Sequence, residues 1–349
     1  MSASDYPRFI TGPSQPLRPR SLILMPNWIG DLLTALAVVE DKSAQTDEQI
    51  ELLVPEGMTD LVRLLSPLPV ISYRRRSRVA MRATLAEVRA RAFDRIYLLP
   101  FSFSSGWFAF KSRIPTRRGI CREGRWLLLT ERLPRTTRDL GVHITQEYAS
   151  VLNIPPRNPE TLRGQRIAVN RVHAGTIVFC PGAVYGPAKR WLGFAELATT
   201  LSAERIVVLG SEAETDASVS IARAAPSRVT DLAGKTSLIE AARIVAGARL
   251  VVSNDSGLMH LAAYLGVPTV AIFGSTSPVW TRPIGDRAKV VQSDVECSPC
   301  FDRTCRYGHY RCLREISVHR VTEACRVMLD ARVEGQNQNE ELTHGGEKR

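Results

Sequence analysis

The sequence predicts an α/β protein made of two doubly wound parallel sheets. Short apolar runs alternate with amphipathic stretches of helical length, which is typical of β-strands joined by helices. The alternation occurs on both sides of a polar, proline-rich stretch, Ile154–Gly164. The 349 residues are enough for two domains, each with its own core. We expect ligands at the carboxyl ends of the strands, in a cleft between the domains.

The first domain is expected over residues 21–160, after a mobile tail at residues 1–20. Its strands are expected at Ser21–Met25, Ile50–Val54, Pro69–Ser72 and Arg95–Leu99. Its helices are expected at Asp31–Glu40, Thr59–Leu65 and Val79–Ala92.

The second domain is expected over residues 170–330, before a mobile tail at residues 334–349. Its strands are expected at Thr176–Cys180, Arg205–Leu209, Leu250–Ser253, Thr269–Phe273 and Lys289–Gln292. Its helices are expected at Phe194–Ser202, Glu214–Ala225, Ser237–Ala246 and Gly257–Leu265.

The composition excludes several classes of protein. Charged residues make up 23% and aromatic residues 7% of the chain, which excludes wholesale disorder. No apolar run is long enough to span a bilayer, and the N-terminus interrupts any secretion signal with Pro and Arg. We therefore expect a cytoplasmic protein.

The net charge of +11 is concentrated in one segment. Arg63–Arg125 contains 15 basic residues and three acidic ones. Such a field attracts nucleic acid, an anionic membrane surface or a phosphorylated substrate, or it simply keeps the protein soluble. Only the charge suggests nucleic acid, and the chain lacks a helix-turn-helix, RRM or zinc-finger pattern, so we expect no nucleic-acid partner.

Three polar loops follow predicted strands. The first, Pro26–Asp31 (PNWIGD), places Asp31 near the start of a helix, either facing the cleft or as an ordinary N-cap. The second, Pro181–Trp191, combines small residues with Lys189, which suits a phosphate. This second loop lacks the spacing of a P-loop. The alternative to a phosphate site is a flexible loop with a solvated pair of cations.

The third loop, Ser253–His260, opens a helix. The N–H groups of Ser256, Gly257 and Leu258 would be free there to bind a pyrophosphate. His260 would either face the same ligand or lie at the edge of the core. The next strand ends in a hydroxyl-rich loop, Gly274–Pro278, at the same face.

Four cysteines lie within 16 residues near the end of the chain: Cys297, Cys300, Cys305 and Cys312. Tetrahedral zinc is one interpretation, with His309 as an additional ligand, and reduced structural thiols are the other. The spacing departs from paired CxxC motifs, and no placed base supports catalysis by cysteine.

Taken together, these segments resemble the ADP-heptose–lipopolysaccharide heptosyltransferases, glycosyltransferase family 9. PNWIGD, PGAxxGPAKRW and NDSGLMH carry the resemblance, which runs from Ser21 to Leu329 and is closest to members that add the second heptose. The cysteine-rich stretch Ser298–Cys312 also occurs in some members. The resemblance implies a GT-B fold, in which two Rossmann-like domains face each other.

The resemblance also implies a reaction. It is the inverting, metal-independent transfer of L-glycero-D-manno-heptose from ADP-heptose to the first heptose of the Kdo–lipid A inner core, in lipopolysaccharide biosynthesis. No cofactor is expected. Asp31 would be the catalytic base, and protein groups would neutralise the leaving diphosphate. The donor site implied by the resemblance comprises Gly182, Lys189, Lys235, Thr236, Asp255, Ser256, Gly257, Leu258 and His260, with adenosine near Gly210–Glu214.

The acceptor would carry carboxylates and phosphates, which gives the basic segment a role. Acceptor contacts are expected from Asn27, Trp28, Gly30, Arg74, Arg75, Arg76, Arg113 and Arg117. The same segment suits peripheral contact with the inner face of the inner membrane. Two alternatives stay open: a family 9 enzyme acting on Kdo or on a later core heptose, and a non-catalytic nucleotide-sugar-binding protein.

Overall fold

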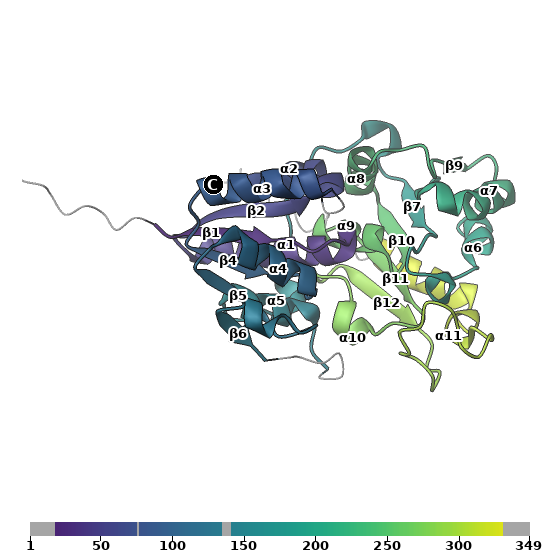
Figure 1. Cartoon of the computed structure of the whole chain (residues 1–349). Helices are drawn as coiled ribbons and strands as arrows, with labels where there is room; N and C mark the ends of the chain where they lie inside the picture. The colour runs from purple at the N-terminus through teal and green to yellow at the C-terminus, as the bar shows by residue number, and fades with distance from the viewer. Residues whose placement is uncertain (1–17, 75–76, 135–140, 331–349) are drawn as a thin grey trace, which may run out of the picture.

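The computed structural model describes residues 18–74, 77–134 and 141–330. They form two six-stranded parallel sheets with helices on their faces, which confirms the expected fold class (Figure 1). The tails expected at the two ends lie almost entirely outside these residues, and the domain boundaries remain predictions. No helix among the described residues is long and apolar enough to cross a bilayer.

The first sheet has the strand order β3-β2-β1-β4-β5-β6. Its strands are β1 (Arg20–Leu24), β2 (Gln49–Pro55), β3 (Val70–Tyr73), β4 (Arg95–Leu98), β5 (Thr116–Ile120) and β6 (Glu131–Leu133). The helices of this half are α1 (Ile29–Gln45), η1 (Glu56–Met58), α2 (Thr59–Leu65), α3 (Arg78–Ala90), α4 (Phe103–Ser112), η2 (Arg125–Leu128) and α5 (Ile144–Leu152).

The second sheet has the order β12-β11-β10-β7-β8-β9. Its strands are β7 (Ile177–Cys180), β8 (Ile206–Val208), β9 (Val229–Asp231), β10 (Leu250–Asn254), β11 (Thr269–Phe273) and β12 (Ala288–Gln292). The helices are η4 (Pro159–Thr161), η5 (Arg171–His173), η6 (Pro187–Lys189), α6 (Phe194–Thr200), η7 (Glu212–Glu214), α7 (Thr215–Ala224), α8 (Leu238–Gly247), α9 (Gly257–Tyr264), α10 (Pro278–Thr281) and α11 (Arg311–Arg314). A further helix covers 318–330.

Each sheet reverses its strand order at one point, between β1 and β4 in the first and between β7 and β10 in the second. Ligands of doubly wound folds bind at such switch points, beyond the carboxyl ends of the strands. The loop after β1 is the PNWIGD segment, and the loops after β7 and β10 are the other two polar motifs. The fold therefore places all three motifs where a ligand is expected.

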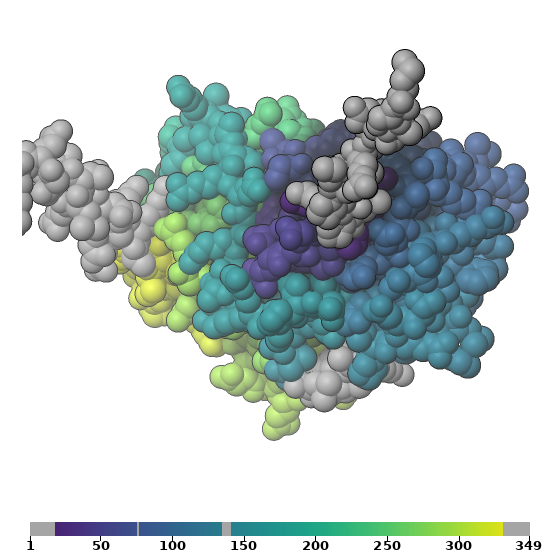
Figure 2. Space-filling model, turned by 90° about the vertical axis from the view of Figure 1, so that its left-hand side faces the viewer, coloured from purple at the N-terminus to yellow at the C-terminus, as the bar shows by residue number. Residues whose placement is uncertain are grey.

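Helices α1 and α9 join the two halves. They pack against each other at the junction of the sheets (Figure 1). One buried apolar cluster takes residues from both halves, among them Leu36 of α1 and Leu261 of α9. In Figure 2 the purple and blue N-terminal half lies on one side of the molecule, and the green and yellow segments lie on the other.

Candidate active site

Asp31 lies in the first turn of α1, beside the first switch point. The N-cap of this helix is Trp28, which makes no side-chain capping bond. The interpretation of Asp31 as the N-cap is therefore wrong. A carboxylate in the first turn is stabilised by the helix dipole.

Two residues just before α1 lie beside Asp31 in the chain. The hydroxyl of Tyr73, at the end of β3, donates a 2.8 Å hydrogen bond to Oδ1 of Asn27. This bond fixes the side chain of Asn27 at the end of β1. The indole of Trp28 is 57% exposed, so it offers a free apolar face next to Asp31.

His260 lies on α9, but its ring packs against α1. A Cβ added to Gly30 would lie 2.6 Å from Cδ2 of the ring, so only glycine leaves room for it. Nδ1 of His260 lies 3.4 Å from Oγ1 of Thr34. Burial lowers the pKa of His260 to about 4, so the ring is neutral at pH 7. His260 therefore positions the two helices rather than presenting a charge.

Lys189 is held by a buried carboxylate. Its Nζ lies 2.5 Å from Oδ2 of Asp255, and the two side chains are 12% and 4% exposed. Oγ1 of Thr276 donates to the same carboxylate oxygen over 2.5 Å. Nζ also lies 4.6 Å above the ring of Tyr185. Lys189 is thus a fixed, nearly buried cation and not half of a solvated pair.

The side chain of Asn254 connects the loops at the second switch point. Its Nδ2 donates to the carbonyl of Pro181 over 2.6 Å, and its Oδ1 accepts from the N–H of Trp191 over 3.2 Å. These two bonds close the loop that carries Lys189 onto the end of β10. The cation therefore keeps a fixed place relative to the start of α9.

The N-terminus of α9 meets the N-terminus of α1. A Cβ on Gly257 would lie 3.0 Å from Cβ of Ile29. Among the described residues, the N–H groups of Ser256, Gly257 and Leu258 have no hydrogen-bond acceptor. Three donors and the positive end of a helix dipole therefore converge close to Asp31, as an anion site requires.

The remaining donor residues lie on loops that touch one another. A Cβ on Gly182 would lie 2.6 Å from Cδ of Glu214, the residue that closes the capping box of Ser211. The loop before Lys235 joins them, since the N–H of Gly234 donates to Gly210 over 2.9 Å. Lys235 itself pairs with Asp231, and Thr236 is half-buried beside it. The expected adenosine residues thus form one continuous edge.

Two residues near this site were not found from the sequence. Burial, followed by the charge of Asp31, raises the pKa of Tyr148 on α5. His143, the N-cap of α5, donates from Nε2 to the carbonyl of Arg282 over 2.9 Å, and burial lowers the pKa of its ring to about 4. No sequence pattern indicated them, because only tertiary packing brings α5 to α1 and α10.

The expected acceptor arginine Arg74 has a partner of its own. It forms a bidentate ion pair with Glu56, with N–O distances of 2.6 and 2.7 Å. Both side chains are more than half exposed, so solvent weakens this pair. Its neighbours Arg75 and Arg76 lie outside the described residues.

Arg113 and Arg117 lie at the opposite edge of the first sheet from Asp31. Arg113 ends α4, and Arg117 is at the start of β5, whereas Asp31 follows the carboxyl end of β1. Strands of four or five residues separate the two edges by roughly 15 Å. The structure therefore does not bring these two arginines to Asp31. Arg113 and Arg117 belong to the same basic segment as Arg74. Membership of that segment does not indicate at which edge of the sheet each arginine lies.

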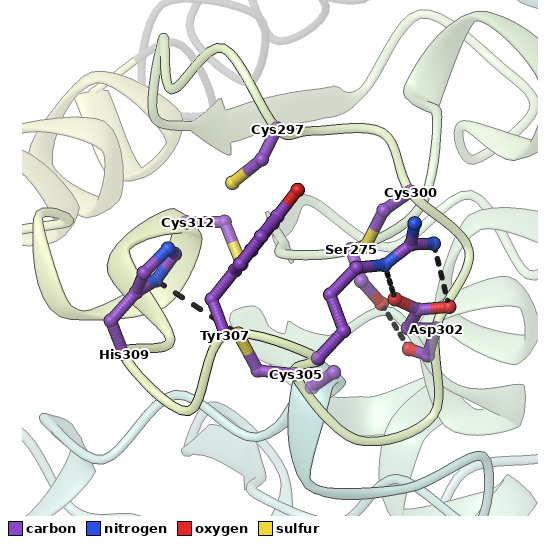
Figure 3. A pocket seen from close by; sticks show the side chains of 10 residues that line it. Ser275, Cys297, Cys300, Asp302, Cys305, Tyr307, His309 and Cys312 are labelled. Carbon is purple, nitrogen blue, oxygen red and sulfur yellow. Dashed lines mark hydrogen bonds and ion pairs between the residues drawn. The ribbon is translucent and has the colours of Figure 1, made fainter.

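The four cysteines surround a small cavity, with Tyr307 lying across it (Figure 3). All four are free thiols, and Sγ of Cys305 lies 3.9 Å from Nδ1 of His309. Backbone N–H groups, that of Tyr310 foremost, lower the pKa of Cys305, whereas burial raises the pKa of Cys312 to about 11. Within the described part of the chain, no three potential ligands are arranged to hold a metal ion. The zinc interpretation gains no support from this arrangement.

Comparison with known proteins identifies the family of this chain. The family model of glycosyltransferase family 9 (heptosyltransferase) matches residues 81–311. Lipopolysaccharide heptosyltransferase 2 of Escherichia coli K12 is 28% identical over 340 residues, covering 88% of this chain and 98% of that protein. Lipooligosaccharide heptosyltransferase 2 of Haemophilus influenzae is 29% identical over 309 residues, covering 78% of this chain and 88% of that protein.

A solved structure agrees over nearly the whole chain. The structure of E. coli ADP-heptose LPS heptosyltransferase II superposes with a TM-score of 0.74 at 27% identity. The match covers 90% of this chain and 99% of that one. The family model extends over more than half of the 349 residues and includes the Lys189 loop and the start of α9. The chain therefore belongs to glycosyltransferase family 9, the heptosyltransferases.

Proposed function

We propose that this enzyme transfers L-glycero-D-manno-heptose from ADP-heptose to the first heptose of the Kdo–lipid A inner core. The observation that carries the proposal is the meeting of two helix N-termini. One bears a carboxylate, Asp31, and the other presents three N–H donors next to Lys189. This pairing suits a reaction that removes a proton at one atom and releases an anion a few ångströms away.

In the proposed reaction, Asp31 takes the proton of the acceptor hydroxyl while that oxygen attacks the anomeric carbon of heptose. The bond between this carbon and the diphosphate oxygen breaks, its electron pair goes to ADP, and the configuration inverts. Trp28 and Asn27, beside Asp31, suit the acceptor sugar. Attack from the side opposite the diphosphate needs the two groups to face each other, which the junction of α1 and α9 supports.

When the bond to the anomeric carbon breaks, the leaving diphosphate gains one negative charge, which the protein must neutralise together with the charges already on the diphosphate. Lys189 has three N–H donors and gives one to Asp255, so the others are available for phosphate oxygens. The N–H groups of Ser256, Gly257 and Leu258 complete the set. We therefore propose that the transfer step uses no metal, because fixed protein donors supply the charge.

The acceptor is tested by offering two substrates in the presence of EDTA. The purified enzyme is incubated with ADP-heptose and either Kdo–lipid A or its mono-heptosylated form, and ADP release and product mass are followed. We expect transfer only to the heptosylated acceptor. Transfer to Kdo would keep the chemistry and change the acceptor, and no transfer to either would favour a nucleotide-sugar-binding protein. Loss of turnover on adding EDTA would contradict the metal-free step.

A further inference from the structure

Helix α4 presents a row of aromatic side chains to solvent. Phe103, Trp107 and Phe110 follow the i, i+4, i+7 spacing of one helix face, and each is nearly half exposed. The rings of Trp107 and Phe110 stack with their centroids 5.9 Å apart. The other face of α4 packs into the core through Phe108 and Ala109. A surface helix normally turns polar residues outward, so this row indicates a contact surface.

The short helix η2 extends this surface with Trp126 and Leu127, which are 50% and 66% exposed. We call Phe103, Trp107, Phe110, Trp126 and Leu127 the aromatic patch.

A buried arginine fixes the two parts of the aromatic patch together. Arg125, fully buried at the start of η2, donates from Nη1 to Oγ of Ser105 over 2.7 Å and from Nε to the carbonyl of Ile120 over 2.8 Å. A Cβ on Gly106 would lie 3.0 Å from its Cβ, so α4 and η2 are in direct contact. The aromatic patch is therefore a rigid surface and not a pair of loose loops.

Cations border the aromatic patch. Lys111 lies 4.7 Å above the ring of Trp107, Arg117 lies 6.0 Å from that of Phe110, and Arg132 lies 5.5 Å from that of Trp126. A hollow of about 420 Å³ next to Phe110 is lined by Arg89, Phe110, Lys111, Arg113 and Arg117. The border thus comprises five cations: Arg89, Lys111, Arg113, Arg117 and Arg132. None of the five forms an ion pair with a carboxylate of the described residues. Their charge is thus available to a partner.

We propose that the aromatic patch and its border of cations dock this enzyme on an anionic lipid surface. Aromatic rings are favoured at the membrane–water interface, and lysine and arginine beside them contact anionic headgroups. A second copy of the chain would set five cations against five cations, which opposes self-association. The exposed aliphatic side chain of Leu127 suits lipid better than it suits a stacked nucleic acid base.

The position of the aromatic patch relates the docking to the reaction. Helix α4 follows β4, so Phe103 starts at the same strand-end edge as Asp31. A lipid-linked acceptor would then reach the site from the surface that holds the enzyme. In this respect the inference rests on the proposed function. The lipid binding itself is measured without acceptor, so the two are tested separately.

The experiment is co-sedimentation of the full chain with vesicles of phosphatidylcholine alone or mixed with phosphatidylglycerol. Two variants are compared with wild type: Trp107→Ser with Leu127→Ser, and Lys111→Gln with Arg132→Gln. The matched control changes an exposed cation and an exposed apolar residue elsewhere, Arg171→Gln with Val172→Ser on η5. We expect binding only to the anionic vesicles, roughly 10- to 30-fold weaker in both patch variants and unchanged in the control.

Other outcomes would overturn the inference. These are equal binding to both vesicle types, equal binding by all variants, or a patch-dependent dimer or single-stranded nucleic acid complex without lipid binding. The charge variant alters only exposed side chains, so it remains informative if Trp107→Ser with Leu127→Ser fails to fold. With a detergent-dispersed acceptor, both variants should turn over at the wild-type rate. Lipid binding without any heptose transfer would keep the docking and overturn the proposed function.

Discussion

The two switch points share one topology but present opposite charge. Between β1 and β4, the first loop leads to a helix whose first turn carries the carboxylate of Asp31. Between β7 and β10, the corresponding loops carry Lys189 and a helix start with three free N–H donors. A doubly wound sheet thus fixes where a ligand is bound, while the residues on its loops decide whether that place accepts a proton or binds an anion.

The largest effect is expected from the carboxylate of the first switch point. Asp31→Asn keeps the size of the side chain but removes the base, so kcat should fall by about 10³-fold. The measurement is ADP release under saturating donor and acceptor. Asp60→Asn is the matched control, because Asp60 also lies in the first turn of a helix, α2, and is largely exposed. An Asp31→Asn enzyme with more than a tenth of the wild-type kcat would contradict this role.

At the second switch point, Lys189→Met should lower kcat/KM by about 10²-fold, because the developing charge on the diphosphate loses a donor. It also leaves Asp255 buried without its cation, so Lys189→Met with Asp255→Asn should cost less than the sum of the two single changes. Lys289→Met, an exposed lysine on β12, serves as control. Strict additivity of the two changes would show that the pair does not act as one unit.

The contact between the two switch points is probed by Gly30→Ala. The added Cβ would lie 2.6 Å from the His260 ring, so the helices must move apart. We expect a destabilisation of about 1–3 kcal/mol in urea unfolding and a smaller fall in kcat than for Asp31→Asn. Gly57→Ala, with no atom within 4 Å of the added Cβ, should be neutral. If Gly30→Ala with His260→Ala is no more stable than Gly30→Ala alone, the clash is not the cause.

The smallest effect is expected further along the same helix pair. The hydroxyl of Tyr264 donates to Oε1 of Glu40 over 2.8 Å, and burial raises the pKa of Glu40 to about 7. The folded state then binds a proton more tightly than the unfolded state, so this carboxyl lowers stability as the pH rises from about 4.5 to about 7. Relative to wild type, Glu40→Gln should gain roughly 2–4 °C in Tm over that range. A constant difference in Tm between the two would refute this.

Strands with continuous apolar runs were predictable from the sequence, because both faces of a parallel sheet are covered. The helix at Thr59–Leu65 and the strand at Thr269–Phe273 have the predicted bounds. The short, polar strands β5, β6 and β9 were missed; β6 and β9 are edge strands, and in β5 the residues Arg117 and Arg118 conceal the apolar pattern. Helix α4 was missed because its outward face is aromatic, and no amphipathic period marks it.

The three site loops were predictable because each follows a clear strand. Their mutual contacts were not, because they depend on the packing of α1 against α9. The neutrality of His260 arises at that junction, whereas the approach of Tyr148 and the bond from His143 to Arg282 depend on the packing of α5 against α1 and α10. The separation of Arg113 from Asp31 has another origin, because α4 begins at the edge of the first sheet where Asp31 lies and ends with Arg113 at the opposite edge.

The division of labour between the switch points is tested most directly by calorimetric titration of ADP into two variants. The base takes no part in holding the nucleotide, so Asp31→Asn should bind ADP within about twofold of wild type. Lys189→Met should bind it at least about tenfold more weakly, because a charge-assisted hydrogen bond to phosphate is lost. Equal weakening in both variants, or loss of ADP binding in Asp31→Asn alone, would contradict the account.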